Sequence, residues 1–313
     1  LKDIISIVCW TGRKIGWPTQ LPFSSNQWIS GLTIIALILS AIGVWEAIRV
    51  PSVRTVEVPL ARLPQALDGF TIAQITDLHA SALLPRPRVQ RVVDRINELQ
   101  PDVILITGDI IDGTPANRAK DIAPLTALKA KYGIFACAGN HEYYSNIDAW
   151  TRAFSQLELP LLHNKHVVLN IEGRPIVIAG LTDPVASQFG HPGPDIHAAL
   201  KNAPHGAVRI LMAHQPRNAR QHAKAGADLQ LSGHTHGGQI IGLSQLAAFF
   251  NAGFISGRYQ VGPMILYVSR GTGLWNGFPI RLGVPAEITR IILRSTDTSS
   301  TKGYAMRPVQ EHG

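Results

Sequence analysis

The chain begins with one long apolar stretch and continues with many short apolar runs. Residues 28–45 contain no charged side chain and have tryptophan at both ends. As a helix this stretch spans about 27 Å, close to the thickness of the hydrocarbon layer of a membrane, and tryptophan suits both membrane interfaces. We therefore predict a transmembrane helix over residues 28–48. The alternatives are a buried core helix and the apolar region of a signal peptide.

Residues 1–27 form an N-terminal flank, and its first ten residues resemble the tail of an earlier membrane span. Because the sequence starts with Leu1 rather than Met, we expect it to begin within a longer reading frame. Basic residues lie on both sides of the predicted helix in nearly equal number. The positive-inside rule therefore leaves the orientation open, with a slight preference for a cytoplasmic location of Arg13 and Lys14.

After a linker and a first strand in residues 49–69, strand-like runs alternate with helix-like segments. Apolar residues on one face indicate helices over residues 86–100, 121–130 and 147–159. Runs that are apolar on both faces favour an α/β domain with covered sheets over residues 70–294. The expected strands are residues 70–77, 102–109, 132–140, 166–171, 175–183, 207–214, 228–236, 263–271 and 286–294.

Two of these runs are separated only by Glu172 and Gly173, which predicts a hairpin and therefore mixed sheets. The polar residues 295–313 are expected to form a disordered tail.

Composition narrows the class of protein. The 313 residues are 45% hydrophobic and only 16% charged, which favours a membrane-embedded part. The net charge of +8 suits anionic partners such as phosphate esters, lipid headgroups or nucleic acid. The two cysteines, Cys9 and Cys137, are not expected to pair, so a disulfide framework is excluded.

Side chains that can bind metal ions follow five of the predicted strands, where each apolar run ends. Open α/β sheets carry their sites at the carboxyl ends of strands. Carboxylates and imidazoles together suit a divalent transition metal, and Asp109 can bridge two ions. A single Asp-x-His pair is usually chance, but five such strand ends in order are a strong signal. The residues are Asp77, His79, Asp109, Asp112, Asn140, His141, His214, His234 and His236.

Glycine accompanies these residues, most clearly in the stretch SGHTHGGQ, residues 232–239. Glycine lets the backbone come close to ions and substrate because it has no Cβ atom. We expect His234 and His236 to serve two different ions. The alternative is two ordinary histidines on a turn.

The motifs DLH, GDIID, GNHE, AH and GHTH occur in this order, and the region from about Phe70 to Arg294 resembles the calcineurin-like metallophosphoesterases. The resemblance implies a four-layer α/β/β/α sandwich with two divalent metal ions, commonly Mn, Fe or Zn. It implies one ion held by Asp77, His79, Asp109 and His236, and another held by Asp109, Asn140, His214 and His234.

The resemblance also implies roles for the remaining motif residues. His141 would face the substrate phosphate as a catalytic residue, together with the bridging Asp109, and Asp112 would orient neighbouring side chains without binding metal. The family often has Asp where this sequence has Glu142, a position that does not bind metal. The expected reaction is hydrolysis of a phosphodiester or pyrophosphate bond by a metal-activated hydroxide.

More narrowly, GHTHGGQ and the N-terminal span resemble a bacterial membrane-associated branch, some of whose members hydrolyse nucleotide-lipid precursors such as UDP-diacylglucosamine. This implies a phosphoester substrate that is lipid-linked or a nucleotide, and a location in the bacterial inner membrane with the side of the domain left open. Two alternatives are a metal-dependent nuclease and a non-catalytic scaffold. No basic–aromatic strip or nucleic-acid module supports nucleic acid as a partner, and the complete set of ligand types argues against a scaffold.

Several features outside the motifs are also open to interpretation. The apolar stretch of residues 240–260 is expected to form a core helix, with an apolar approach for acyl chains as the alternative. Arg258, Arg270 and Arg281 can reach a substrate phosphate, or else bond to backbone or solvent. The other histidines are expected to be structural or on the surface: His163, His166, His191, His197, His205, His222 and His312.

Overall fold

The computed structural model describes residues 10–11, 14 and 24–296. The chain divides into two compact units, residues 1–45 and 46–313. Cys9, most of the predicted flank and residues 297–313 of the predicted tail lie outside the described residues.

Helix α2 (Ser25–Ile48) forms where the sequence predicts a transmembrane helix. Its residues Asn26–Ile48 are long and apolar enough to cross a membrane, which is a statement about length and composition. Apolar side chains are exposed along it, including Leu37 at 65% and Ile34 at 57%.

Two mixed sheets form the rest of the molecule. In the first, β11 is parallel to β1 and antiparallel to β2, and β2, β3 and β4 are parallel to one another. Its strand order is β1 (Ser52–Leu60), β11 (Glu287–Ser295), β2 (Thr71–Ile75), β3 (Val103–Thr107) and β4 (Ile134–Cys137).

The second sheet is parallel from β6 to β10 and has an antiparallel strand at each edge. Its order is β5 (Lys165–Ile171), β6 (Arg174–Gly180), β7 (Val208–Met212), β8 (Leu229–Ser232), β10 (Met264–Val268) and β9 (Gly257–Val261). The predicted hairpin joins β5 to β6, and Glu172 and Gly173 both have positive φ angles, as a two-residue turn between twisted strands requires.

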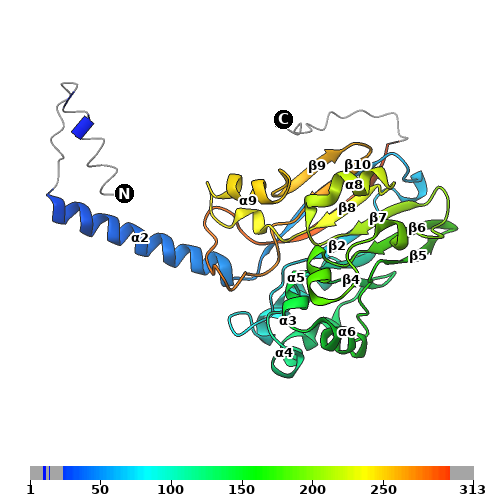
Figure 1. Ribbon diagram of the computed structural model, residues 1–313, viewed down its shortest axis with the longest axis horizontal. Coiled ribbons are helices and arrows are strands. Elements are labelled where there is room, and N and C mark those ends of the chain that lie inside the picture. Colours follow the sequence, from blue (N-terminus) through cyan, green and yellow to red (C-terminus); the bar gives the residue numbers. More distant parts are fainter. Residues whose placement is uncertain (1–9, 12–13, 15–23, 297–313) are drawn as a thin grey trace. The chain divides into compact units, whose positions relative to one another are not determined.

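Three apolar clusters show that the sheets and helices form four layers. One cluster packs helices against the first sheet, one fills the space between the sheets, and one packs helices against the second sheet. Helices α3, α4 and α6 lie outside the first sheet, and α8 lies outside the second (Figure 1). The predicted α/β/β/α sandwich is therefore confirmed. The helices are α3 (Arg86–Asn97), α4 (Pro115–Ile122), α5 (Asn140–Tyr144), α6 (Ile147–Gln156), α7 (Ile196–Ala199), α8 (Ala219–Lys224) and α9 (Ser244–Phe250).

The structure corrects two helix predictions. The helix expected over residues 121–130 begins earlier, as α4, and ends in a 3₁₀ turn at Ala123–Ala127, because Pro124 lacks the amide hydrogen that an α-helix interior needs. The core helix expected within residues 240–260 is wrong. Only Ser244–Phe250 is helical, none of its residues is buried, and strand β9 follows. Gly242 and Gly253 adopt left-handed φ angles on either side of α9, which stops the helix from extending.

Candidate metal centre

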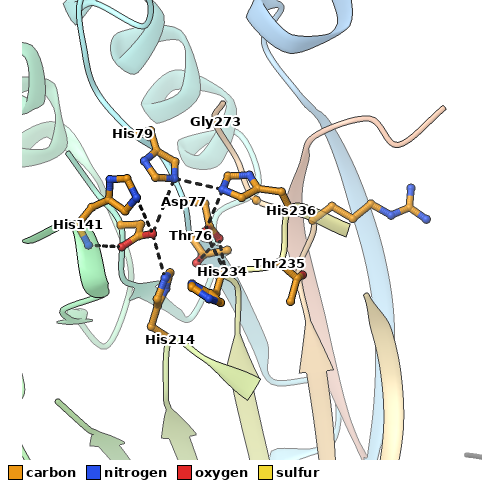
Figure 2. Close-up of polar contacts among 12 residues, drawn as sticks. Thr76, Asp77, His79, His141, His214, His234, Thr235, His236 and Gly273 are labelled. Atoms are coloured by element: carbon orange, nitrogen blue, oxygen red, sulfur yellow. Dashed lines mark hydrogen bonds and ion pairs between the residues drawn. The ribbon is translucent and has the colours of Figure 1, made fainter. Parts of the chain in front are cut away.

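The predicted ligand residues lie together where parallel strands of both sheets end. Asp77 and His79 follow β2, Asp109 follows β3, and Asn140 follows β4 in the first sheet. In the second sheet, His214 follows β7, and His234 and His236 follow β8. Figure 2 shows Asp77 and His79 from the first sheet and His214, His234 and His236 from the second turned toward a common centre. Parallel strands end at the same sheet edge, which is why residues so far apart in sequence meet here.

One group of atoms forms around His79 and His236. The Nε2 atoms of these two rings are 3.2 Å apart, and Nε2 of His236 is 3.5 Å from Oδ1 of Asp77. Asp109 lies beside this group, since its Oδ2 atom is 3.8 Å from Nε2 of His79. Asp77, His79 and His236 are all buried and offer ligand atoms within 4.8 Å of one another.

A second group lies on the other side of Asp109. Nε2 of His214 is 3.0 Å from Oδ2 of Asp109, and Nδ1 of His234 is 2.9 Å from Oδ1 of Asn140. Asp109, His214 and His234 likewise offer atoms within 4.8 Å of one another. The carboxylate of Asp109 therefore faces both groups.

Asp112 and His141 border the first group. Oδ1 of Asp112 accepts hydrogen bonds from Nδ1 of His79 at 3.1 Å and from Nδ1 of His141 at 2.5 Å. Nε2 of His141 lies 4.0 Å from Oδ2 of Asp109, and the His141 side chain is 20% exposed. His79, Asp109 and His141 also offer ligand atoms within 4.8 Å of one another. Asp112 thus holds two rings at once, and His141 is the histidine of this group that reaches solvent.

Hydrogen bonds at Nδ1 of two histidines leave their Nε2 lone pairs facing the centre. Nδ1 of His79 donates to Asp112, and Nδ1 of His214 donates to the backbone oxygen of Thr107 at 2.8 Å. Each ring then has a bare Nε2 atom. Nε2 of His214 is buried, has no hydrogen-bond partner among the described residues, and faces a carboxylate oxygen of Asp109. Two acceptors facing each other require a cation between them, so the donor set fits divalent metal ions.

The pKa values of the histidines at this centre agree with a site for divalent metal ions. Burial lowers the pKa of His214, but the attraction of Asp109 outweighs burial and raises that pKa well above its usual value. A proton on His214 would thus stand in for a metal ion. Burial, followed by His214, lowers the pKa of His234 to about 3, and burial, followed by Arg281, lowers the pKa of His236 well below its usual value. Both rings are therefore neutral at physiological pH, as metal ligands must be.

Several ligand residues have a strained backbone. Positive φ angles are rare for residues other than glycine and cost roughly 1–2 kcal/mol each. Such angles occur at five of the predicted ligand residues, Asp77, His79, Asp109, His234 and His236, with φ between 46° and 70°. The chain presents these side chains in left-handed conformations two or four residues after a strand ends.

Two glycines make the close approach possible. A Cβ atom on Gly139 would collide with the carboxylate of Asp109, and one on Gly233 would collide with the carboxylate of Asp77. The expectation that glycine makes room for the ligands is thereby confirmed at these two positions.

Glu142 has a role that the sequence analysis missed. Its carboxylate accepts backbone N–H groups from Asp109 at 3.0 Å, Ile110 at 2.7 Å and Gly139 at 2.7 Å. Burial, followed by repulsion from Asp109, raises the pKa of Glu142 to about 7. This side chain does not face the ligand atoms but fastens the two loops that carry Asp109 and Asn140. The signal in the sequence was an acidic residue directly after the GNH motif.

Arg281 is another residue whose role the sequence left open. It is fully buried, and its Nη2 atom donates to the backbone oxygens of Arg270 at 2.8 Å and Gly273 at 2.9 Å. Nη2 also lies 2.9 Å from Nδ1 of His236, and Nη1 donates to the backbone oxygen of His236 at 3.4 Å. Arg281 therefore contacts His236 directly as well as through its charge.

Arg258, His166 and His222 follow the structural alternative, whereas Arg270 lies near a carboxylate. Arg258 donates to the backbone oxygen of Glu57 at 2.7 Å, and Arg270 lies 4.0 Å from Glu287. His166 is paired with the backbone oxygen of Ala199 and His222 with the side chain of Gln230. His312 lies outside the described residues.

A cavity of about 930 Å³ opens beside the metal-binding groups. Asp109, Asn140 and His141 are among the polar residues that line it. Its apolar lining includes Leu243, Leu246, Phe250, Trp275 and Phe278. The cavity therefore joins a polar, metal-binding end to an apolar end.

Comparisons with known proteins find similarity to metallophosphoesterases. The family model of the calcineurin-like phosphoesterases matches residues 70–238. A protein of Danio rerio described as a transmembrane protein with metallophosphoesterase domain is 34% identical over 275 residues, which covers 84% of this chain and 62% of that protein. The chain thus spans less than two thirds of this relative.

A bacterial relative and a solved structure are also similar to this chain. An uncharacterized metallophosphoesterase of Bacillus subtilis is 32% identical over 246 residues, covering 75% of this chain and 82% of that protein. The crystal structure of a calcineurin-like phosphoesterase from the same organism aligns with a TM-score of 0.44 at 18% identity, covering 67% of this chain and 83% of that one.

Proposed function

Because the chain belongs to the calcineurin-like phosphoesterase family, and so to the metal-dependent phosphoester hydrolases, we propose that it is a membrane-anchored enzyme with two metal ions that hydrolyses a phosphodiester or pyrophosphate bond. The observation that supports this most is the carboxylate of Asp109 between two groups of buried ligand atoms. Helix α2, which is long and apolar enough to cross a membrane, supports the anchor.

We assign the ligands according to the two groups. Asp77, His79, Asp109 and His236 would hold one ion, and Asp109, Asn140, His214 and His234 the other. The ions would be divalent, with Mn, Fe or Zn matching the mixture of imidazole and carboxylate ligands. Bound there, they would neutralise charge on a phosphoryl group and activate water as the attacking group.

The protein's own contribution begins with His141. Burial lowers the pKa of this ring, but Asp112 and Asp109 outweigh burial and raise it to about 9. Because Nδ1 donates to Asp112, a proton on Nε2 is free to reach the substrate. His141 would stabilise charge on a phosphoryl oxygen and protonate the leaving oxygen.

Asp112 would act through the rings that it holds. By accepting from both His79 and His141, it fixes the tautomer of a metal ligand and that of the proton donor together. Asn276 donates to the other oxygen of Asp112 at 2.8 Å, so the carboxylate cannot rotate without losing a partner.

The substrate would be an amphiphilic or nucleotide phosphoester. The apolar residues along one part of the cavity support a lipid-linked compound. A metal-dependent nuclease is the second candidate, and the positive net charge is the observation in its favour. We favour the lipid-linked compound. A nucleic-acid strand needs basic side chains that bind its successive phosphates, and the apolar wall of the cavity has none.

The decisive experiment measures metal content and turnover together. The full chain, purified in detergent and loaded with manganese, should hydrolyse a chromogenic phosphodiester, and chelation should abolish this activity. Asp109→Asn should abolish turnover and lower the metal content, because the shared charge is lost. Asp148→Asn, on an exposed carboxylate outside the centre, is the matched control.

Three results would contradict parts of the proposal. A folded protein that takes up no metal would refute the metal centre. Full activity in Asp109→Asn would refute the ligand assignment. Faster cleavage of single-stranded DNA than of a UDP-linked lipid would favour the nuclease.

A further inference from the structure

The apolar end of the cavity continues onto an uncharged surface. Residues 239–257 contain no acidic, basic or histidine side chain. Within them Ile241 is 73% exposed, Leu246 62%, Phe249 79% and Phe250 68%. Water-exposed apolar residues in such a contiguous group mark a surface that binds something apolar.

A second segment joins this surface at the cavity mouth. Trp275 and Phe278 are 40% and 36% exposed, and both line the cavity together with Leu246 and Phe250 of α9. We call α9 with its flanking residues 241–243 and the loop 275–278 the apolar rim. The rim therefore contains aliphatic, phenylalanine and tryptophan side chains, and several of them line the cavity that also contains metal-binding residues.

The loop of the rim is fastened to the end of α2. Ala47, in the last turn of α2, packs with Leu84 and Leu274 in a buried cluster. The guanidinium of Arg88 donates to the backbone oxygens of Ile48 and Thr272 at 3.1 and 3.0 Å. The residues just before Trp275 are thus held against the point where the chain leaves α2.

From this connection we infer that the apolar rim is a second membrane contact, which inserts into the surface of the lipid bilayer that α2 crosses. The inference rests on the membrane anchor of the proposed function. A spanning helix that ends at Ile48 and is followed by Arg49 must leave the bilayer there. The loop carrying Trp275 is then held close to the lipid–water interface, where tryptophan is favoured.

A lipid bilayer fits this surface better than a protein partner does. Protein interfaces combine apolar contacts with a polar rim and arginine, whereas the 239–257 segment has no charge with which to select a partner. The polar side chain of Asn251 is buried and donates to the backbone oxygen of Ala247, so it does not face outward. A surface already held beside a membrane also binds it at high effective concentration.

The consequence for the enzyme concerns the route of the substrate. Leu246 and Phe250 belong both to the exposed rim and to the cavity wall. With the rim in the bilayer, a phosphoester with acyl chains would reach the metal centre without its chains crossing water. The mouth of the cavity would open at the lipid headgroups.

A fluorescent probe tests the insertion directly. In the full chain with Cys9 replaced by Ser, a polarity-sensitive dye is attached to Phe249→Cys. The control carries it at Val168→Cys, an exposed position of β5 that is 43% accessible. Cys137 is buried, and burial raises the pKa of its thiol, so it does not take the dye. The protein is reconstituted in vesicles of phosphatidylethanolamine and phosphatidylglycerol.

We expect a blue-shifted emission at position 249 that nitroxide-labelled lipids quench, and water-like, unquenched emission at position 168. Water-like emission at position 249 would overturn the inference. A blue shift that lipid nitroxides do not quench would also overturn it, since the surface would then be covered by a second copy or by another protein.

A kinetic arm separates this inference from the proposed function. Ile241→Ser with Phe249→Ser changes two exposed residues that do not line the cavity. We expect turnover of a phosphodiester lipid embedded in the vesicles to fall roughly tenfold, with turnover of a small water-soluble phosphodiester unchanged. Equal losses on both substrates would overturn the membrane contact. A native protein inactive on the soluble diester would instead contradict the proposed function.

Discussion

The Oε2 atom of Glu142 accepts a hydrogen bond of 3.0 Å from the backbone N–H of Asp109. Asp109 has a φ angle of 50°, a conformation that persists only where the surroundings enforce it. Because the same carboxylate also accepts from Gly139 and Ile110, it ties the loop after β3 to the loop after β4. The position of the shared carboxylate therefore depends on a side chain that does not face the ligand atoms.

We predict that Glu142→Ala lowers the free energy of unfolding of the metal-free protein by about 2–4 kcal/mol. The physical reason is that buried backbone N–H groups lose their hydrogen-bond acceptor. Urea denaturation in detergent measures the loss. Glu142→Asp, which keeps a carboxyl group on a shorter side chain, should lose less, and an unchanged stability in Glu142→Ala would show that water replaces the carboxyl group.

Removal of Arg281 should be comparably severe. Arg281→Met leaves the carbonyls of Arg270 and Gly273 without their donor, and we expect a loss of about 2–4 kcal/mol in unfolding free energy. Arg281→Lys keeps the charge but has a single nitrogen, so its stability should be intermediate. The exposed Arg95→Met, whose partner Glu98 is also exposed, is a control that should change stability little. An equal effect of both Met variants would contradict the role of the buried carbonyls.

The metal-free protein should lose stability as pH rises from about 6.5 to about 9. The pKa of His141 is raised to about 9 from an ordinary value of 6.5, since Asp112 and Asp109 outweigh burial. A folded-state pKa above the unfolded one contributes stability at low pH and loses it as pH rises through the folded value. The contribution is at most about 3 kcal/mol.

The test measures the free energy of unfolding across this pH range for two metal-free proteins, the native chain and His141→Asn. The variant should show a flatter profile, with the remaining slope due to His214 and Glu142, whose pKa values are also raised. Parallel profiles would mean that His141 is not held by Asp112 in the absence of metal.

The sequence predicted most of the fold because most strands are short, continuously apolar runs. A run such as Val103–Thr107 is buried at every position, and such runs can be recognised without knowing their neighbours. The metal-binding residues were predictable for a related reason, since each follows the end of a parallel strand. What could not be read was the conformation that turns them inward. Left-handed angles at Asp77 or His236 leave no mark on the residue type.

The errors came from segments whose environment is decided by tertiary contacts. The stretch around α9 has the composition of a core helix, and only the folded molecule shows Phe249 outside. The role of Arg281 was equally hidden, because its carbonyl partners belong to loops that no periodic pattern defines. The exposure of these side chains, and not their hydrophobicity, therefore distinguishes this surface from a core helix.

The last prediction separates binding of metal from the chemistry of the substrate. His141→Ala should reduce turnover by roughly 10²–10⁴-fold, the range for loss of a general acid, while both metal ions remain bound. The reason is that His141 reaches solvent and has its Nε2 atom 4.0 Å from Asp109, farther than the buried His214 at 3.0 Å. His214→Ala, by contrast, removes a buried nitrogen from the second group and should lower the metal content.

Metal content by elemental analysis and turnover of a soluble phosphodiester are measured on the same preparations. A decisive refinement uses a phosphodiester with a more acidic leaving group, which needs less protonation. With this substrate the deficit of His141→Ala should shrink, whereas that of His214→Ala should not. If His141→Ala instead loses metal, the ring is a ligand, and the division of roles between the ligands and the proton donor is wrong.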